Sequence, residues 1–188
     1  MSSHIKLKTA SKALEQGGVI AYPTEAVFGL GCDPMDREAV FRILELKERH
    51  VKQGMILIAS SIEQLSDYIQ PLEKLGELRA KEIRASWPGG NTWILPCKAS
   101  VPYWITGIHR GLAVRVTDHP IAAKICEHYG GPIVSTSANV HGREPTRSVF
   151  ETFKVFGDSV DYIVPGSVDK NKSPSVIRDG LTGKTLRI

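Results

Sequence analysis

The chain has 188 residues, of which 41% are hydrophobic and 23% are charged, as is typical of one globular domain. Residues 1–12 lack the apolar stretch of a signal peptide, and no apolar run approaches the ~20 residues of a membrane span, so we expect a cytoplasmic protein with no membrane contact. A formal net charge of +4 favours polyanionic partners such as nucleotides, phosphates or RNA.

Strand-like and helix-like segments alternate through the first half of the chain. We expect a strand at 19–22, a helix at 36–47, a strand at 55–59 and helices at 61–69 and 72–87. The helix at 36–47 is predicted from Val40, Ile43 and Leu44, which recur at helical spacing behind a possible Asp36 cap. The run at 55–59 is apolar throughout and short enough for a buried strand.

The second half continues the alternation and ends in a hairpin. We expect strands at 92–97 and 112–116, a helix at 119–129, a strand at 132–136, a helix at 147–156 and a strand at 161–164. Segments 176–179 and 184–188 flank a glycine-rich loop and predict a terminal β-hairpin. Because strands and helices interleave and hairpin links are present, the pattern predicts an α/β or α+β domain around one mixed sheet.

Several common sites are absent from the sequence. The three cysteines, Cys32, Cys97 and Cys126, are far apart and form no C-x-x-C pair, which argues against a disulfide framework or a zinc site. The six histidines show no H-x-x-x-H spacing, so we predict no metal site built from protein ligands. The chain also contains no G-x-x-x-x-G-K-[ST] loop and no G-x-S-x-G motif, which argues against a Walker-type nucleotide site and a serine hydrolase.

Polar residues interrupt an apolar run at Tyr22-Pro-Thr-Glu25, just before Phe28-Gly-Leu-Gly31. One interpretation is a strand end and turn, in which Thr24 and Glu25 satisfy backbone groups. The other is a site, because ligands often dock at strand ends in α/β sheets and glycines allow the backbone to approach them. The segment alone leaves both interpretations open.

Basic residues crowd the end of the predicted helix at 36–47, in Leu46-Lys-Glu-Arg-His-Val-Lys52. Cations favour helix C-termini because of the helix dipole, so a purely structural role is one explanation. The alternative is a phosphate clamp, in which Arg49 binds through its planar fork and Lys47 acts as a point charge.

The strand at 132–136 runs into hydroxyls and an amide in Pro132-Ile-Val-Ser-Thr-Ser-Ala-Asn139. Serine and asparagine often cap turns. Hydroxyls and backbone N–H groups at a strand end can also bind a phosphate or the head group of an amino acid.

Taken in order, these segments resemble a known family. Tyr-Pro-Thr-Glu with Gly-Leu-Gly-Cys-Asp, Leu-Lys-x-Arg, Leu-Ala-Val-Arg-Val at 112–116, Ser-Thr-Ser-Ala-Asn and Ser-Pro-Ser-Val-Ile-Arg-Asp at 173–179 are similar to the motifs of YrdC-type threonylcarbamoyl-AMP synthases. The match runs from about residue 10 to the C-terminus. It implies a single domain over residues 1–188, with a twisted, open mixed sheet, flanking helices and a central basic cavity.

The resemblance implies an enzyme. It would condense L-threonine, bicarbonate and ATP, with Mg²⁺, into threonylcarbamoyl-AMP and pyrophosphate, without a covalent nucleophile. Partner proteins would then use the adenylate to modify adenosine 37 of tRNA. The implied ATP-binding residues are Lys47, Arg49, Ser137, Asn139 and Arg187. The implied threonine-binding residues are Thr24, Arg115, Thr136 and Ser175.

The chain departs from the family pattern at three positions. His50 replaces the proline that usually follows Lys-x-Arg, Gln53 stands where a lysine or asparagine is common, and His141 replaces the usual serine after Ser-Ala-Asn-x. We expect activity to survive because Lys47 and Arg49 are retained. The role of a third basic group is put in doubt, because Gln53 occupies the position where a lysine or asparagine is common.

Two other functions are compatible with parts of the sequence. The basic charge and the family resemblance also fit a tRNA-binding or double-stranded RNA-binding module with little catalysis. A carbamoyl-transfer relative is the other alternative, but the chain has no acylphosphatase-like or zinc-finger region.

Overall fold

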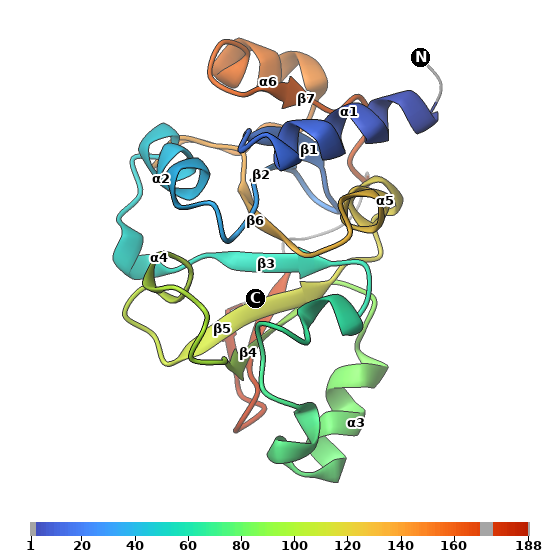
Figure 1. The fold of residues 1–188 in the computed structure, drawn as a ribbon, viewed down its shortest axis with the longest axis vertical. Helices are drawn as coiled ribbons and strands as arrows, with labels where there is room; N and C mark the ends of the chain where they lie inside the picture. Colours follow the sequence, from blue (N-terminus) through green and yellow to red (C-terminus); the bar gives the residue numbers. More distant parts are fainter. Residues whose placement is uncertain (1–2, 170–174, 188) are drawn as a thin grey trace.

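The computed structural model describes residues 3–169 and 175–187 (Figure 1). Within these ranges the strands form a nine-stranded sheet in the order β7-β1-β2-β6-β3-β5-β4-β8-β9. Its strands are β1 (Ile20–Pro23), β2 (Phe28–Gly31), β3 (Ile56–Ala59), β4 (Asn91–Pro96), β5 (Gly111–Val116), β6 (Ile133–Ser137), β7 (Tyr162–Ile163), β8 (Val176–Asp179) and β9 (Thr185–Arg187). The sheet is mixed, as expected: β1 with β7, β3 with β5 and β4 with β8 are parallel pairs, and the other neighbours are antiparallel.

Helices flank the sheet. They are α1 (Ser3–Glu15), α2 (Arg37–Leu46), α3 (Glu77–Ala85), α4 (Tyr103–Thr106), α5 (Pro120–Tyr129) and α6 (Val149–Phe156), with the 3₁₀ turns η1 (Val51–Gln53), η2 (Glu63–Leu65) and η3 (Leu72–Leu75). Figure 1 shows α1 and α6 at one end of the twisted sheet and α3 at the other. No helix in the described ranges has the length and apolar character needed to cross a bilayer.

The predicted starts and stops of two helices are confirmed. The Asp36 side chain accepts a hydrogen bond from the backbone N–H of Ala39 at 3.0 Å and caps α2. Gly130 ends α5 in the left-handed conformation with φ 83°, which a residue without a Cβ adopts at little cost.

The predicted helix at 61–69 is wrong, and the one at 72–87 is interrupted. Only the short turn η2 forms in the first segment, because the chain turns toward β4 there: Ile69 forms a β-bridge with Cys97, and Gln70 N–H donates to Pro96 O. In the second, Gly76 separates η3 from α3 with φ 88°.

Helix α1 and strand β2 were not predicted, and neither were the short elements η1 and α4. Helix α1 forms from a mostly polar segment because Leu7, Ala10 and Leu14 lie on one buried face, which packs against α5. Strand β2, Phe28–Gly31, forms a hairpin with β1 where the sequence suggested a turn. Gly31 is needed there, because a Cβ would come within 2.6 Å of Val134 O.

The sheet buries side chains on both faces. Ile20, Tyr22 and Ile58 pack in a cluster with apolar residues of α1 and α5. Residues whose side chains point to the opposite face of the sheet, such as Ala21 and Leu57, belong to a larger cluster that includes the apolar side of α2. This double-sided packing fixes the strand ends, and several of them meet at one cavity.

Candidate active site

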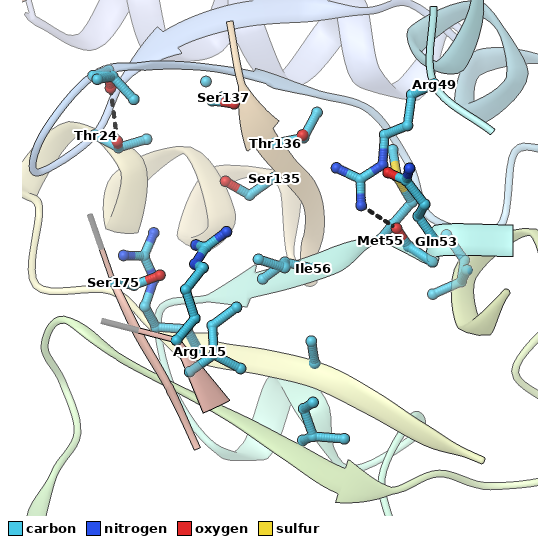
Figure 2. Close-up of a pocket in the computed structure, with 18 of the residues that line it drawn as sticks. Thr24, Arg49, Gln53, Met55, Ile56, Arg115, Ser135, Thr136, Ser137 and Ser175 are labelled. Carbon is cyan, nitrogen blue, oxygen red and sulfur yellow. Dashed lines mark hydrogen bonds between the residues drawn. The ribbon is translucent and has the colours of Figure 1, made fainter. Parts of the chain in front are cut away.

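A cavity of about 320 Å³ lies between the two halves of the sheet (Figure 2). The β1–β2 loop, β6, the start of β3, β5 and the C-terminal hairpin all contribute to its wall. Seven of the nine residues implied by the family resemblance line it: Thr24, Arg49, Arg115, Thr136, Ser137, Ser175 and Arg187. The other two, Lys47 and Asn139, contact Ser137 but are not among the described residues that line the cavity.

Arg115 and Glu25 form a buried ion pair in this wall. Arg115 Nη1 lies 3.0 Å from Glu25 Oε2, and the two side chains are 9% and 4% exposed. The other carboxylate oxygen, Oε1, accepts a 2.6 Å hydrogen bond from the Thr117 hydroxyl. The sequence left the role of Glu25 open between a turn and a site. In the structure Glu25 pairs with Arg115, one of the residues that the family resemblance implied in threonine binding.

The Thr24 hydroxyl has a defined polarity. Its hydrogen is donated to Val27 O at 2.7 Å, and the Thr24 N–H donates to the same carbonyl at 3.1 Å (Figure 2). The hydroxyl oxygen can therefore only accept a further hydrogen bond. A donor such as an amine or a hydroxyl suits this side of the cavity.

Arg49 reaches the cavity from the end of α2 through a reversed turn. The N–H of Glu48 donates to Glu45 O at 3.0 Å and the N–H of Arg49 donates to Leu44 O at 2.9 Å, which is a Schellman ending. Glu48 takes the left-handed position with φ 51°, where glycine is usual. This reversal separates the side chains of Lys47 and Arg49, so that only Arg49 faces the cavity.

The Arg49 guanidinium keeps binding capacity. Its Nη2 donates to Gly54 O at 2.7 Å, while Nε is buried and has no hydrogen-bond partner among the described residues. Burial and then the like charge of Arg187 lower the pKa of Arg49. Two arginines that repel each other at a cavity wall favour an anion between them.

Lys47 has a different environment from the one expected of a free phosphate ligand. It is 5% exposed, and its ammonium donates to Ser137 O, to Asn139 O at 2.9 Å and to Asn139 Oδ1 at 3.1 Å. Burial and the nearby charge of Arg49 lower the pKa of Lys47 to about 8.

Asn139 is also fully engaged with protein groups. Its Oδ1 accepts from Ser137 Oγ at 2.6 Å, and its Nδ2 donates to the carbonyls of Val140 and Arg143. Lys47 and Asn139 thus hold the end of β6, whose residues 135–137 line the cavity.

The sequence missed some residues of this site. Thr117 could have been found, because it directly follows β5, and residues two apart in an extended chain share a face with each other, as Thr117 does with Arg115. Ser135 also lines the cavity; it lies in the hydroxyl-rich segment at 132–139 that was singled out, but the family resemblance gave it no role. His109, another lining residue, carried no distinguishing signal. Residues 173 and 174 of the Ser-Pro-Ser motif lie outside the described residues. Within the described ranges no three His, Cys, Asp or Glu side chains are grouped to hold a metal ion.

Comparison with known proteins places this geometry in a family. The model for Sua5_yciO_yrdC, described as "Telomere recombination", matches residues 12–188. A threonylcarbamoyl-AMP synthase of Halorhodospira halophila is 50% identical over 97% of this chain and 94% of its own length. One from Pseudomonas aeruginosa is 44% identical over 100% and 99%.

A solved structure with the same fold contains an amino acid. The crystal structure of P. abyssi Sua5 complexed with L-threonine is 33% identical and has a TM-score of 0.82, with 92% of this chain and 50% of that chain covered. This chain therefore spans about half the length of the P. abyssi protein. With the matches of sequence and of fold in agreement, the chain belongs to the Sua5/YciO/YrdC family.

Proposed function

We propose that this protein is an L-threonylcarbamoyladenylate synthase, a nucleotidyltransferase that acts in tRNA modification. The threonine amine and bicarbonate condense to a carbamate with loss of water. A carbamate oxygen then attacks the α-phosphorus of ATP, and pyrophosphate leaves with the electrons of the broken P–O bond. The synthase names of relatives that match nearly the whole chain support this activity.

The observation that carries the proposal is a cavity with cationic groups of two kinds. Arg115 is paired with Glu25, whereas Arg49 and Arg187 line the same cavity and repel each other as like charges. The first suits a single carboxylate that shares the arginine with Glu25. The second suits a polyphosphate, whose several charges offset the repulsion of two arginines. We infer that the cavity as a whole is basic.

The proposed contacts follow from donor and acceptor directions. Arg115 binds the threonine carboxylate, and Thr24 accepts from the amine or the hydroxyl of threonine, with Thr136 and Ser175 beside them. Arg49 and Arg187 bind the triphosphate. Lys47, Asn139 and Ser137 belong to the ATP side as well, where Lys47 and Asn139 hold the strand end that carries Ser137.

Catalysis then depends on positioning and charge. Holding three reactants together removes much of the entropic barrier, and cations stabilise the charge that develops on the leaving pyrophosphate. Mg²⁺ would enter with ATP as its counter-ion, because the carboxylate that lines the cavity, Glu25, is already bound to Arg115 and Thr117.

We further propose that residues 1–188 act as one domain in the cytoplasm and deliver the adenylate to proteins that transfer threonylcarbamoyl to adenosine 37 of tRNA. An RNA-binding module with little catalysis is not favoured, since the matching relatives bear the name of a synthase. Direct contact with tRNA is compatible with the net charge of +4.

Pyrophosphate release from ATP, with threonine, bicarbonate and Mg²⁺ omitted in turn, tests the function. Release should require each of them. Release that is indifferent to threonine would remove the proposal.

Arg49→Met tests the phosphate site, and Lys81→Met, which changes an exposed cation on α3, is its control. We expect KM for ATP to rise more than tenfold in the first variant, because hydrogen bonds to charged groups contribute about 1.5–3 kcal/mol each. The control should match the wild type. Equal ATP kinetics in both variants would show that Arg49 does not bind the phosphates.

A further inference from the structure

The Thr117 hydroxyl lies at the start of a directed chain of hydrogen bonds. It accepts from the backbone N–H of His119 at 3.2 Å, at the beginning of α5. Because this donor fixes one side of the hydroxyl, its own hydrogen is directed to Glu25 Oε1 at 2.6 Å. The Thr117 backbone is also held, since its N–H donates to Ala59 O at 3.0 Å.

Glu25 links Thr117 to Arg115 through its two carboxylate oxygens. Its Oε1 is held by Thr117, and its Oε2 lies 3.0 Å from Arg115 Nη1. Glu25 comes from the β1–β2 loop, 92 residues before Thr117 in sequence. In the sheet, β2 is separated from β5 by β6 and β3, so the contact joins elements on opposite sides of the cavity.

One edge of Arg115 is not paired with any described protein group. Glu25 contacts Nη1, whereas Nε is buried and has no hydrogen-bond partner among the described residues. A guanidinium receives a carboxylate side-on through its Nε edge, with two parallel hydrogen bonds. Figure 2 shows the Arg115 side chain rising from β5 into the cavity.

We propose that Thr117 and Glu25 are positioning residues that hold Arg115 with this edge unpaired, and so select an amino acid with a free α-carboxylate. The inference rests on the proposed function. Glu25 compensates the buried arginine when no substrate is bound, and Thr117 prevents the carboxylate from rotating onto the edge that the substrate uses. Preorganisation of this kind strengthens binding, because the side chain need not be ordered again by the ligand.

Thr117 allows the effect of positioning to be isolated. It is 2% exposed and is not among the described residues that line the cavity, so it does not touch the substrate. Any effect of its hydroxyl on threonine must therefore be transmitted through Glu25 and Arg115. ATP binding, which we assign to Arg49 and Arg187, should not change.

The experiment compares Thr117→Val, which keeps the shape of the side chain and removes the hydroxyl, with Thr117→Ser, which restores the hydroxyl. Pyrophosphate release is measured with threonine and ATP varied separately. In Thr117→Val we expect KM for threonine to rise about tenfold and KM for ATP to stay within about twofold, from the usual effect of a hydrogen bond to a charged group. Thr117→Ser should resemble the wild type. Equal KM values for threonine in the two variants would overturn the proposed positioning role of Thr117 and Glu25.

A binding measurement keeps the inference testable if catalysis fails. Calorimetric titration with L-threonine and with L-threoninamide, which lacks the carboxylate, gives the preference for a free carboxylate directly. The wild type and Thr117→Ser should prefer threonine, and Thr117→Val should lose most of that preference. If the wild type shows no preference for threonine over threoninamide, the proposed positioning role of Thr117 and Glu25 is overturned. If the preference is intact but pyrophosphate is not released, only the proposed function is overturned.

Discussion

Replacement of Lys47 by methionine tests the unexpected environment of this residue. The change keeps most of the side-chain volume and removes the ammonium that donates to Ser137 O and to both oxygens of Asn139. Two backbone carbonyls lose a charged donor, while Asn139 Oδ1 keeps its bond from the Ser137 hydroxyl. We expect a loss of about 1–2 kcal/mol in the free energy of unfolding at pH 7, because the relief of a buried charge offsets part of the hydrogen-bond loss.

The pH dependence is the sharper part of this prediction. Burial and then the charge of Arg49 lower the pKa of Lys47 from 10.5 to about 8 in the folded protein. Stability linked to such a group is fully present above the unfolded pKa and is lost as the pH falls through the folded pKa, because the unfolded chain binds the proton more tightly. Between pH 7 and 9.5 the wild type should therefore gain about 2 kcal/mol that the methionine variant lacks.

Urea unfolding at pH 7, 8, 9 and 9.5 measures the difference in free energy of unfolding between the two proteins, so that other titrations cancel. Lys52→Met, which alters an exposed lysine of the same segment, is the control and should give a difference independent of pH. A difference between wild type and Lys47→Met that stays constant or narrows with rising pH would refute the reasoning, because Lys47 would then not be buried as a charge.

Three further changes test the framework of the site by urea unfolding. Glu48→Gly should raise the free energy of unfolding by about 0.5–1 kcal/mol, since Glu48 occupies the left-handed position of the turn, whereas a loss would contradict this strain. Gly31→Ala should lower the free energy of unfolding by more than about 2 kcal/mol, because the new Cβ would lie 2.6 Å from Val134 O. Gly131→Ala is the control, since its Cβ would meet nothing within 3.7 Å. Equal effects of the two changes would be inconsistent with close strand packing at Gly31. Asp36→Ala should cost about 1 kcal/mol through loss of the α2 cap, and no change would mean that the cap is unimportant.

Local sequence signals predicted much of the architecture. Apolar runs located β1, β3, β5 and β6, and helical spacing behind the Asp36 cap located α2, because these features depend on side chains close in sequence. The failure at residues 61–69 has the opposite cause. Hydrogen bonds there run to β4, and a long-range partner decided the conformation against a local helical pattern.

The residue types of the site also followed from the sequence, since hydroxyls, arginines and glycines at strand ends indicate phosphate or amino-acid binding. The separate roles of the individual residues did not follow from the sequence. Lys47 and Arg49 are two residues apart and looked like one clamp, yet the left-handed turn at Glu48 directs them to different surroundings.

The sequence by itself therefore determined most of the strands, several of the helices and the chemical character of the site residues, because each depends on local pattern. Only the tertiary structure decided that Glu25 binds Arg115 and Thr117, and that Lys47 is occupied by the end of β6. These are contacts between strand ends far apart in the chain. Their geometry depends on sheet order and on which charges are buried together, which no local pattern records.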